Sequence, residues 1–298
     1  MVRGVRATGC IGGITGGEPG GEIMLTTTLD GLWVLQVLAG IEVLAPELGL
    51  RPHLPSAEAK QAALAHPVAA ELRAAGAISG DVVDQPVLEW LTVLARRDVA
   101  LLLYAQREAG TEPDRVLLCR FAQWWVALER CGTTVRLSAA GTANTETSAA
   151  LVIRSQIERL CGVRPPAVLR PVVLRTESLL TAARSGSGLG SVLTEHGLDG
   201  DQVDAVTLAA DSRHCTRVSL VALQSGAGRT ADRSFIDSAA VTIHDTPRGR
   251  LVSEQLTRDG TAWSVLAPGS TRNIAAAVNA MMRRLPAREH WHSHRKVV

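Results

Sequence analysis

The chain has 298 residues, 46% of them hydrophobic, and a formal net charge of +2. A chain of this length and apolar content buries one large core or two joined cores. The small charge and the dispersed basic residues exclude the footprint of a nucleic-acid-binding protein. The five cysteines are scattered without a CxxC pair, so neither a disulfide framework nor a zinc ribbon is expected.

The cysteine usage also indicates a reducing, cytoplasmic environment. The longest apolar stretch, Leu32 to Leu44, is interrupted by polar residues and falls short of the roughly 20 apolar residues that a membrane span needs. We therefore expect no transmembrane helix. The Gly-rich N-terminus lacks the hydrophobic block of a signal peptide, and residues 1–23 are predicted to form a disordered extension.

The first predicted elements are a short strand and a set of helices. The strand Thr26 to Leu29 is followed by Asp30, which we expect to cap an apolar helix. A longer helical stretch, Ser56 to Ala75, contains Pro67, which should kink or split it. Another helix is predicted to begin at Pro86, where a proline fits the first turn.

Four successive strand-like runs then lead into a helix. The runs are short, rich in apolar residues and separated by turn signals, which is typical of an antiparallel meander. The predicted strands are Asp98 to Gln106, Arg115 to Phe121, Trp124 to Arg130 and Thr134 to Ala139, and the helix is Ser148 to Cys161.

Proline-containing stretches break the chain after that helix, and we place a boundary there between residues 24–163 and residues 164–298. A short strand, Val172 to Leu174, is expected to bridge the two halves. Thr176 begins the first of three predicted helices, which end near Ala210.

The second half repeats the plan of the first. Its predicted strands are Arg217 to Gln224, Ala239 to His244, Leu251 to Leu256 and Trp263 to Leu266, followed by a helix from Asn273 to Leu285. Two similar sequence segments, Gly76 to Asp84 and Gly197 to Asp204, precede the two meanders. The repeated unit is long and occurs only twice, whereas a solenoid needs several short repeats. The pattern therefore indicates two halves of one continuous fold. We therefore predict an α+β fold whose halves each place a four-strand meander before a helix. Residues from Ala287 onward are predicted to fray.

One glycine-rich stretch, Gly186 to Gly190, resembles a phosphate-binding loop. Such loops follow a strand and present backbone N–H groups at the start of a helix. Here a predicted helix precedes the glycines, so we interpret the stretch as a flexible inter-helix loop. No nucleotide or other cofactor is expected.

The C-terminal residues His290, His292 and His294 are spaced two apart, which on an extended segment places three imidazoles on one side. A frayed tail has no second shell to orient such ligands. We interpret these histidines as incidental and predict no metal site.

A base and a thiol also occur together at His214 and Cys215, close to Asp211. Adjacent residues on a strand point to opposite faces, so these two side chains should not form the hydrogen-bonded pair that activates a thiol. The chain also lacks a GxSxG elbow and an HExxH helix. No catalytic residues are predicted.

Phe121, Trp124 and Trp125 form the densest aromatic cluster. Trp124 and Trp125 should face opposite sides of a strand, so that one packs in the core while the other suits a protein-binding surface. The polar loop Glu108 to Asp114, at a predicted sheet rim, is a second surface candidate.

Several segments together resemble the EspG family of type VII (ESX) secretion-associated proteins of mycobacteria. They are Leu25 to Trp33, Glu47 to Pro52, Asp245 to Arg250 and Pro268 to Ser270. The resemblance covers Met24 to Val298 and leaves out residues 1–23. It implies a two-part fold with quasi-twofold symmetry and a cytosolic chaperone without catalytic residues. It also implies a partner, the helical tip of the PPE protein in a PE–PPE pair.

The resemblance and the surface argument together predict where a partner docks. We expect an apolar groove where the first meander meets the helices between Thr176 and Gly197. An enzyme or a small-ligand protein without a recognisable motif remains the alternative, and a weak homo-oligomer remains open. A deep polar pocket with convergent titratable groups would favour the enzyme. The candidate contact residues are Phe121, Trp124, Trp125, Leu179, Leu180 and Leu193.

Overall fold

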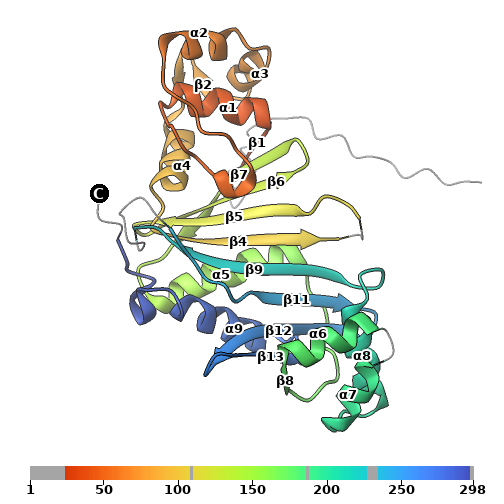
Figure 1. Ribbon diagram of the computed structural model, residues 1–298. Coiled ribbons are helices and arrows are strands. Elements are labelled where there is room, and N and C mark those ends of the chain that lie inside the picture. The colour runs from red at the N-terminus through yellow and green to blue at the C-terminus, as the bar shows by residue number, and fades with distance from the viewer. Residues whose placement is uncertain (1–23, 108–109, 186–187, 227–233, 296–298) are drawn as a thin grey trace, which may run out of the picture.

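The computed structural model describes residues 24–107, 110–185, 188–226 and 234–295 (Figure 1). The predicted extension of residues 1–23 lies outside the described residues. Parts of the predicted loops Glu108 to Asp114, Gly186 to Gly190 and Ser225 to Arg233 also lie outside them.

One large antiparallel sheet runs through the centre of the described structure. It has 11 strands, and the order along the sheet is β1-β7-β6-β5-β4-β9-β11-β12-β13-β8, with β10 paired beside β9. The strands are β1 Met24–Thr28, β4 Val99–Gln106, β5 Asp114–Phe121, β6 Trp124–Cys131, β7 Thr134–Thr142, β8 Val172–Arg175, β9 Thr216–Gln224, β10 Phe235–Ile236, β11 Val241–Thr246, β12 Gly249–Arg258 and β13 Thr261–Pro268.

The strand order confirms the predicted two-part fold and shows its quasi-twofold symmetry. β4 and β9, the first strands of the two meanders, pair antiparallel in the middle, with Val99 opposite Gln224. Moving outward, β5, β6, β7 and β1 on one side match β11, β12, β13 and β8 on the other. Each meander therefore pairs its strands in the same order, and the two halves share one sheet.

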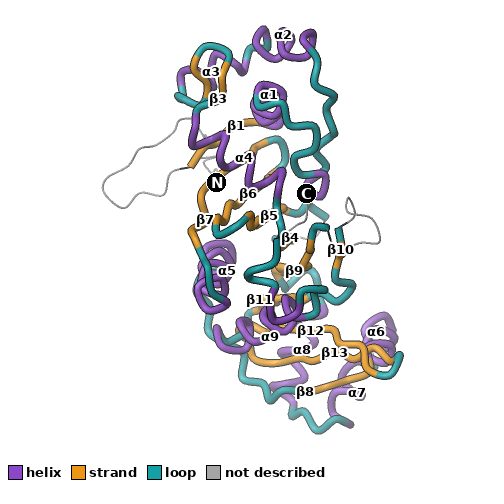
Figure 2. Tube along the Cα trace, turned by 90° about the vertical axis from the view of Figure 1, so that its left-hand side faces the viewer, coloured by secondary structure: helices purple, strands orange, loops and turns teal. Residues whose placement is uncertain are grey.

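Helices cover both faces of the sheet (Figure 2). The two helices that follow the meanders, α5 and α9, pack on one face, here called the α5/α9 face. The helices that precede the meanders lie on the opposite face, α1 to α4 over one end of the sheet and α6 to α8 over the other. The helices are α1 Leu29–Leu38, α2 Ala57–Ala65, α3 Val68–Ala74, α4 Gln85–Arg96, α5 Glu146–Cys161, α6 Thr176–Ser185, α7 Leu189–Glu195, α8 Gly200–Ala210 and α9 Thr271–Arg283.

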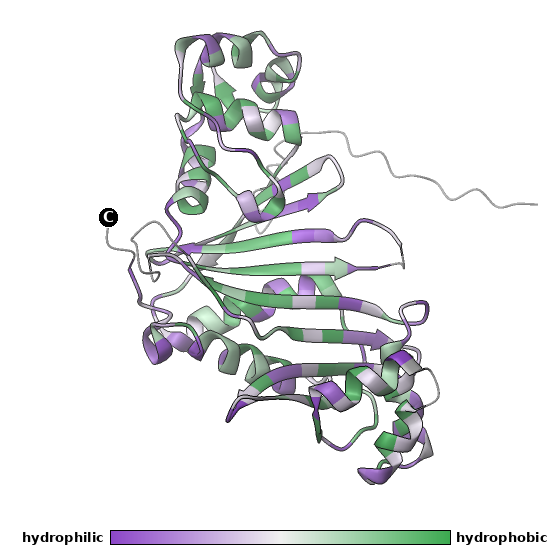
Figure 3. Cartoon of the chain, viewed as in Figure 1, coloured by the Kyte–Doolittle hydropathy of each residue, from purple (hydrophilic) through white to green (hydrophobic). Residues whose placement is uncertain are grey.

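This arrangement explains why the central strands are apolar on both faces (Figure 3). In β4, Leu102 faces the core beneath α1 to α4, whereas Leu101 and Leu103 face the core beneath α5 and α9. A third core, around Leu251 and Leu266, lies beneath α6 to α8. Strands covered on both faces read as continuous apolar runs rather than alternating ones.

The helix signals were predicted well, apart from one cap. The stretch predicted to break at Pro67 is split into α2 and α3. The cap of α1 is Thr28, whose Oγ1 accepts a hydrogen bond from the Gly31 N–H at 3.1 Å, so the assignment of this role to Asp30 was wrong. Asp30 lies inside the first turn, where a carboxylate still favours the positive end of the helix dipole.

The two similar sequence segments before the meanders adopt different structures. In the first, Ile78–Ser79 and Val82–Val83 pair as a small hairpin, β2 and β3, which turns at Gly80 with a φ of 63°. In the second, the Asp199 side chain accepts a hydrogen bond from the Gln202 N–H at 3.0 Å, and α8 begins at once. Helix capping therefore replaces the hairpin.

The expectation that the Val172 strand bridges the halves was wrong. This strand, β8, pairs with β13 and ends the sheet, with Val173 opposite Val265. The halves are joined instead by the β4–β9 pair.

The predicted frayed tail was also wrong for the described residues up to Arg295. Residues Arg288–His290 form a short 3-10 helix, and Trp291 is fully buried. Arg120, itself buried on β5, donates hydrogen bonds to the carbonyl oxygens of Trp291 and His294 at 3.2 and 2.6 Å. This long-range anchor holds the tail against the sheet.

Candidate partner-binding groove

A groove of about 260 Å³ opens between α6, α8 and the sheet. It is called here the sheet–helix groove. One face of α6 forms its wall, because Thr176, Leu179, Leu180 and Ala183 follow the i, i+3, i+4, i+7 spacing of a single helix face. The remaining residues that line it are Leu189, Val206, Ala209, Ala210, Arg217, His244, Leu251, Ser253, Glu254, Gln255, Ser264 and Leu266.

The wall of the groove leaves a large apolar side chain in water. Leu180 is 46% exposed, and Leu179 packs partly against the core beneath α6. Leu251 and Leu266 are buried at the base of the same groove. An exposed leucine above buried apolar residues suits an apolar segment of another protein.

The floor of the groove carries polar side chains that are paired with one another. The hydroxyls of Thr176 and Ser264 lie 2.9 Å apart. His244 Nε2 lies 2.8 Å from Ser253 Oγ. His244, Ser253 and Ser264 come from the neighbouring strands β11, β12 and β13 and share one face of the sheet, whereas Thr176 is the first residue of α6.

His244 is held in its neutral form. Burial, assisted by the nearby positive charge of Arg217, lowers the pKa of His244 to about 4. The Arg217 guanidinium is engaged in capping α8, because it donates to the carbonyl oxygens of Ala209 and Ala210 at 3.0 and 2.7 Å. The floor is therefore hydrogen-bonded and holds a neutral imidazole.

The two halves differ at this place although they share a fold. α1 occupies in the first half the position that α6 occupies in the second, since each directly follows an edge strand, β1 or β8. Leu32 and Leu35 of α1 are 1% and 0% exposed. The space beneath α1 is thus filled, whereas the space beneath α6 is open.

The structure separates the six predicted contact residues into two groups. Leu179 and Leu180 line the sheet–helix groove, and Leu193 is buried beneath them at 0% exposure. Phe121, Trp124 and Trp125 lie in the other half of the fold, on β5 and β6 of the first meander.

The aromatic group itself divides as the strand geometry predicts. Trp125 is 1% exposed in the core beneath α5 and α9, whereas Trp124 is 53% exposed. Phe121 packs partly against the core on the opposite face. The expected junction between the first meander and the helices after Thr176 does not form, because α6 packs on β8 and β13 of the second half.

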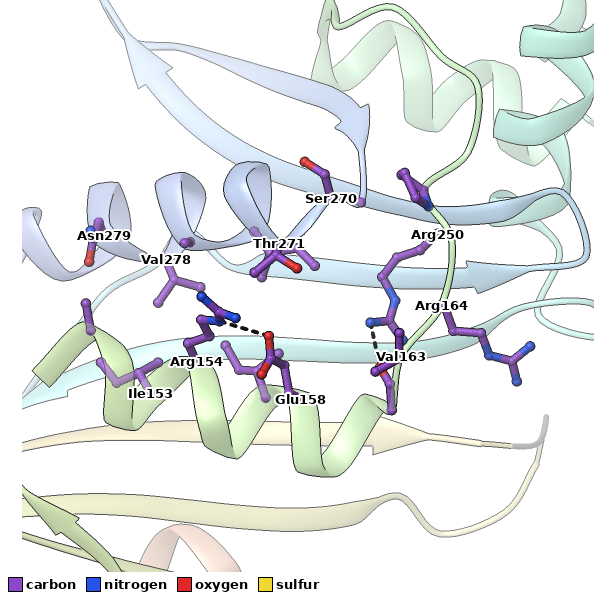
Figure 4. A pocket seen from close by; sticks show the side chains of 17 residues that line it. Ile153, Arg154, Glu158, Val163, Arg164, Arg250, Ser270, Thr271, Val278 and Asn279 are labelled. Carbon is purple, nitrogen blue, oxygen red and sulfur yellow. Dashed lines mark hydrogen bonds and ion pairs between the residues drawn. The ribbon is translucent and has the colours of Figure 1, made fainter. Parts of the chain in front are cut away.

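A second cleft, of about 280 Å³, lies between α5 and α9 (Figure 4). Ile153 and Val278 contribute aliphatic walls. Most of its charged side chains are engaged, since Arg154 pairs with Glu158 at 2.8 Å and Arg250 pairs with Asp245 at 2.6 Å. The cleft is mainly apolar and presents no convergent set of reactive groups.

A more polar cleft, of about 630 Å³, is lined by His214 and Cys215. The sequence analysis considered these two residues as a catalytic base and thiol and did not predict that they act together. His214 and Cys215 lie in the turn before β9 rather than on a strand, and His214 Nδ1 lies 2.9 Å from Asp211 Oδ2. Hydrogen bonds from Arg213 and His214 hold the pKa of Asp211 well below its usual range. Burial raises the pKa of the Cys215 thiol, which keeps it protonated and unreactive.

Comparison with known proteins identifies the family. The EspG family model matches residues 28–280, most of the chain. The chain belongs to the EspG family. ESX-2 secretion-associated protein EspG2 of Mycobacterium tuberculosis is 48% identical over 277 residues, which are 92% of this chain and 100% of that protein. ESX-5 secretion-associated protein EspG5 of Mycobacterium marinum is 28% identical over 92% of this chain and 97% of its own length.

A solved structure shows the same EspG fold. It is the Mycobacterium tuberculosis type VII secretion system chaperone EspG5 in complex with a PE25–PPE41 dimer. The match has a TM-score of 0.72 and 25% sequence identity, and it covers 91% of this chain and 99% of that one. Among the described residues of the present chain, none of the helices is long and apolar enough to cross a membrane.

Sequence reasoning missed the floor of the groove. His244, Ser253 and Ser264 lie on three different strands, far apart in the sequence. The alternation of polar and apolar residues in β12 and β13 was the available signal, because it marks residues that share a face.

Proposed function

We propose that this EspG protein is a chaperone, without catalytic activity, for PE–PPE protein pairs in type VII secretion. It acts in the cytosol, binds the helical tip of the PPE partner and keeps the pair soluble for delivery. The match to EspG5, solved with a PE25–PPE41 dimer, is the observation that carries this proposal. The 48% identity to EspG2 places the chain well inside the family.

The sheet–helix groove is the proposed docking site for that tip. A helical tip brings apolar side chains that must leave water, and Leu179 and Leu180 offer an apolar wall to receive them. The polar side chains of the floor, among them Ser253 and Ser264, are already hydrogen-bonded to neighbouring side chains, so an apolar tip can cover them without leaving them unpaired. A specific complex of this kind buries about 1,200 to 2,000 Å² in total.

The difference between the two halves supports the choice of groove. α1 and α6 are equivalent helices, yet none of the large apolar side chains of α1 is exposed, whereas Leu180 of α6 is 46% exposed. The fold can fill the space beneath α1 in the first half, so the open space beneath α6 is not a requirement of the fold. This favours the space beneath α6 as a binding site for another molecule. Trp124 remains a proposed additional contact outside the groove, because it is the exposed aromatic of its cluster.

The chemistry of the polar cleft does not favour an enzyme. A nucleophilic cysteine needs a lowered pKa and a base within hydrogen-bond reach. Cys215 instead has a raised pKa, and its Sγ lies 3.9 Å from Nδ1 of the neutral His244. The nearby Asp211 is bound to Arg213 and His214.

Co-expression with candidate PE–PPE pairs tests the proposal. We expect one pair to co-elute with this chain as a three-protein complex on a sizing column, and the same pair to aggregate when expressed without it. PE25–PPE41 serves as the comparison pair, because it forms a complex with EspG5. If every pair stays soluble alone and none co-elutes with the chain, the chaperone proposal is wrong.

A further inference from the structure

The cleft between α5 and α9 is apolar and open to solvent, and it is called here the α5/α9 cleft. Its volume is about 280 Å³. Ile153 and Ile157 line it from α5, and Ile274 and Val278 line it from α9. Val163, just after α5, extends this lining and is 97% exposed. A concave space with aliphatic walls is typical of a small-molecule site.

The quasi-twofold symmetry of the fold offers an internal comparison for this cleft. α5 and α9 run antiparallel (Figure 4), so the twofold axis exchanges the two ends of the helix pair. The N-caps Thr145 and Ser270 occupy equivalent positions. Counting from these caps, Thr271 of α9 corresponds to Glu146 of α5.

An ion pair joins the helices at one end only. Arg283 donates hydrogen bonds to both carboxylate oxygens of Glu146, at 2.9 and 3.0 Å. By the same count, the matching residues at the other end are Glu158 and Thr271, which cannot form an ion pair. Glu158 pairs instead with Arg154 of its own helix at 2.8 Å. The α5/α9 cleft lies at this second end, where Glu158 and Thr271 both line it (Figure 4).

The charges around the cleft leave one cation over. The charged residues that line it are Arg154, Glu158, Arg164 and Arg250. Arg154 and Glu158 neutralise each other, and Arg250 donates two hydrogen bonds to the Asp245 carboxylate. Arg164 is exposed and has no ion-pair partner among the described residues. The aliphatic walls thus adjoin one unpaired positive charge, which an anionic group of a ligand complements.

We propose that the α5/α9 cleft binds a medium-chain carboxylate, a single aliphatic chain that ends in a carboxylate group. The chain lies between the aliphatic walls, and the carboxylate pairs with Arg164. An apolar cavity of about 150 Å³ holds benzene, so the 280 Å³ of the cleft suits a chain of about ten carbon atoms. The proposal does not rest on the chaperone function, because the cleft and the sheet–helix groove lie on opposite faces of the sheet.

Calorimetric titration of the full chain with decanoate, below its micelle concentration, tests the proposal. Each buried methylene group strengthens binding about fourfold, so octanoate, which is two methylene groups shorter, should bind roughly tenfold more weakly. Arg164→Gln should weaken decanoate binding about fivefold, because it removes the unpaired charge. The same variant should bind decanol, which has the chain without the charge, as the wild type does.

Filling the cleft provides a second measurement. Ala275 is partly buried and lines the cleft, so Ala275→Leu places a larger side chain inside it. This variant should bind decanoate at least about tenfold more weakly. Ala276→Leu is the matched control, because Ala276 is the next residue of α9, is exposed and does not line the cleft. It should bind decanoate like the wild type. Thermal melting confirms that each variant is folded.

Phosphatidylglycerol vesicles distinguish a free carboxylate from a lipid surface. We expect the chain to bind decanoate and to stay in solution when the vesicles are sedimented. Absence of decanoate binding overturns the proposal, as do equal effects of Ala275→Leu and Ala276→Leu. Sedimentation with the vesicles that decanoate does not reverse would assign the cleft to a membrane surface and would also overturn it. If Ala275→Leu fails to fold, decanoate binding that Arg164→Gln leaves unchanged overturns the proposal, since that exposed residue is not part of the core.

Discussion

The guanidinium of Arg120 donates a hydrogen bond to the backbone carbonyl of Trp291, a residue 171 positions later in the chain. Asp98 lies 3.9 Å from the same guanidinium and accepts a hydrogen bond from the Ala122 N–H at 3.0 Å. Arg120 and Asp98 are both buried. This buried pair connects the start of the central strands to the C-terminal tail, which makes it a stability element of the whole fold.

Replacing Arg120 should therefore destabilise the protein strongly. Arg120→Met removes the fully buried cation beside Asp98, which keeps only the half-exposed Arg295 at 3.5 Å, and it releases the carbonyl oxygens of Trp291 and His294. We expect this change to cost about 3 to 5 kcal/mol. Urea unfolding measures the loss. Arg154→Met is the control, because Arg154 forms an exposed pair with Glu158, and such surface pairs contribute about 1 kcal/mol or less. Equal losses in the two variants would contradict the anchoring role.

The adjacent tryptophans Trp124 and Trp125 should behave differently when cut to alanine. Trp125 is 1% exposed, so Trp125→Ala should cost about 3 to 5 kcal/mol of stability and melt early. Trp124→Ala should keep the wild-type melting temperature, because the side chain is 53% exposed. Early melting of the Trp124 variant would show that this side chain packs.

The client affinity of Trp124→Ala tests the remaining sequence-based contact prediction. A hot-spot contact should lose about 2 kcal/mol or more of binding free energy when truncated. Unchanged affinity in the folded variant would confine the client to the sheet–helix groove.

The partly buried His244 should make stability depend on pH. The unfolded chain protonates this histidine near its ordinary pKa of about 6.5, whereas the folded protein does so near a pKa of about 4. Because the unfolded state binds the extra proton between these values, the contribution of His244 is complete above pH 6.5 and is lost as the pH falls toward 4.

His244→Gln should remove this dependence. Between pH 7 and pH 5 the wild type should lose about 2 kcal/mol more unfolding free energy than the variant. Urea unfolding at the two pH values gives the difference, and an NMR titration reports the pKa of His244 directly. Parallel stability losses in the two proteins, or a histidine that titrates near pH 6.5, would contradict the buried neutral imidazole.

Most of the fold was predictable because its signals are local. Turn residues and short apolar strand runs placed both meanders, and the proline at position 67 placed the break between α2 and α3. The burial of Trp291 was not predictable, since it depends on Arg120 in a distant strand. The similar sequence segments that begin at Gly76 and Gly197 adopt different structures, a hairpin and a helix capped by an aspartate. Tertiary packing decides which of the two structures forms.

The candidate site was predictable in part. Leu179 and Leu180 follow from the amphipathic pattern of one helix, and the groove includes both. Their separation from Trp124 depends on the sheet order, which places the first meander and α6 in different halves. The periodicity of apolar residues along the sequence predicts which residues share a face. It does not predict which distant strands become neighbours in the sheet.

The central claim is that the client docks in the sheet–helix groove. Leu180→Asp places a charge on its wall, while Leu151→Asp adds the same charge to another exposed leucine, on α5. Both variants should melt like the wild type, because neither side chain is part of the buried core.

The most direct measurement is the client dissociation constant of these two variants, determined by calorimetry with the PE–PPE pair that co-elutes with the chain. We predict that Leu180→Asp binds at least about 30-fold more weakly than the wild type, a loss of about 2 kcal/mol or more, and that Leu151→Asp binds normally. Wild-type affinity in a folded Leu180→Asp variant would contradict the assignment of the groove.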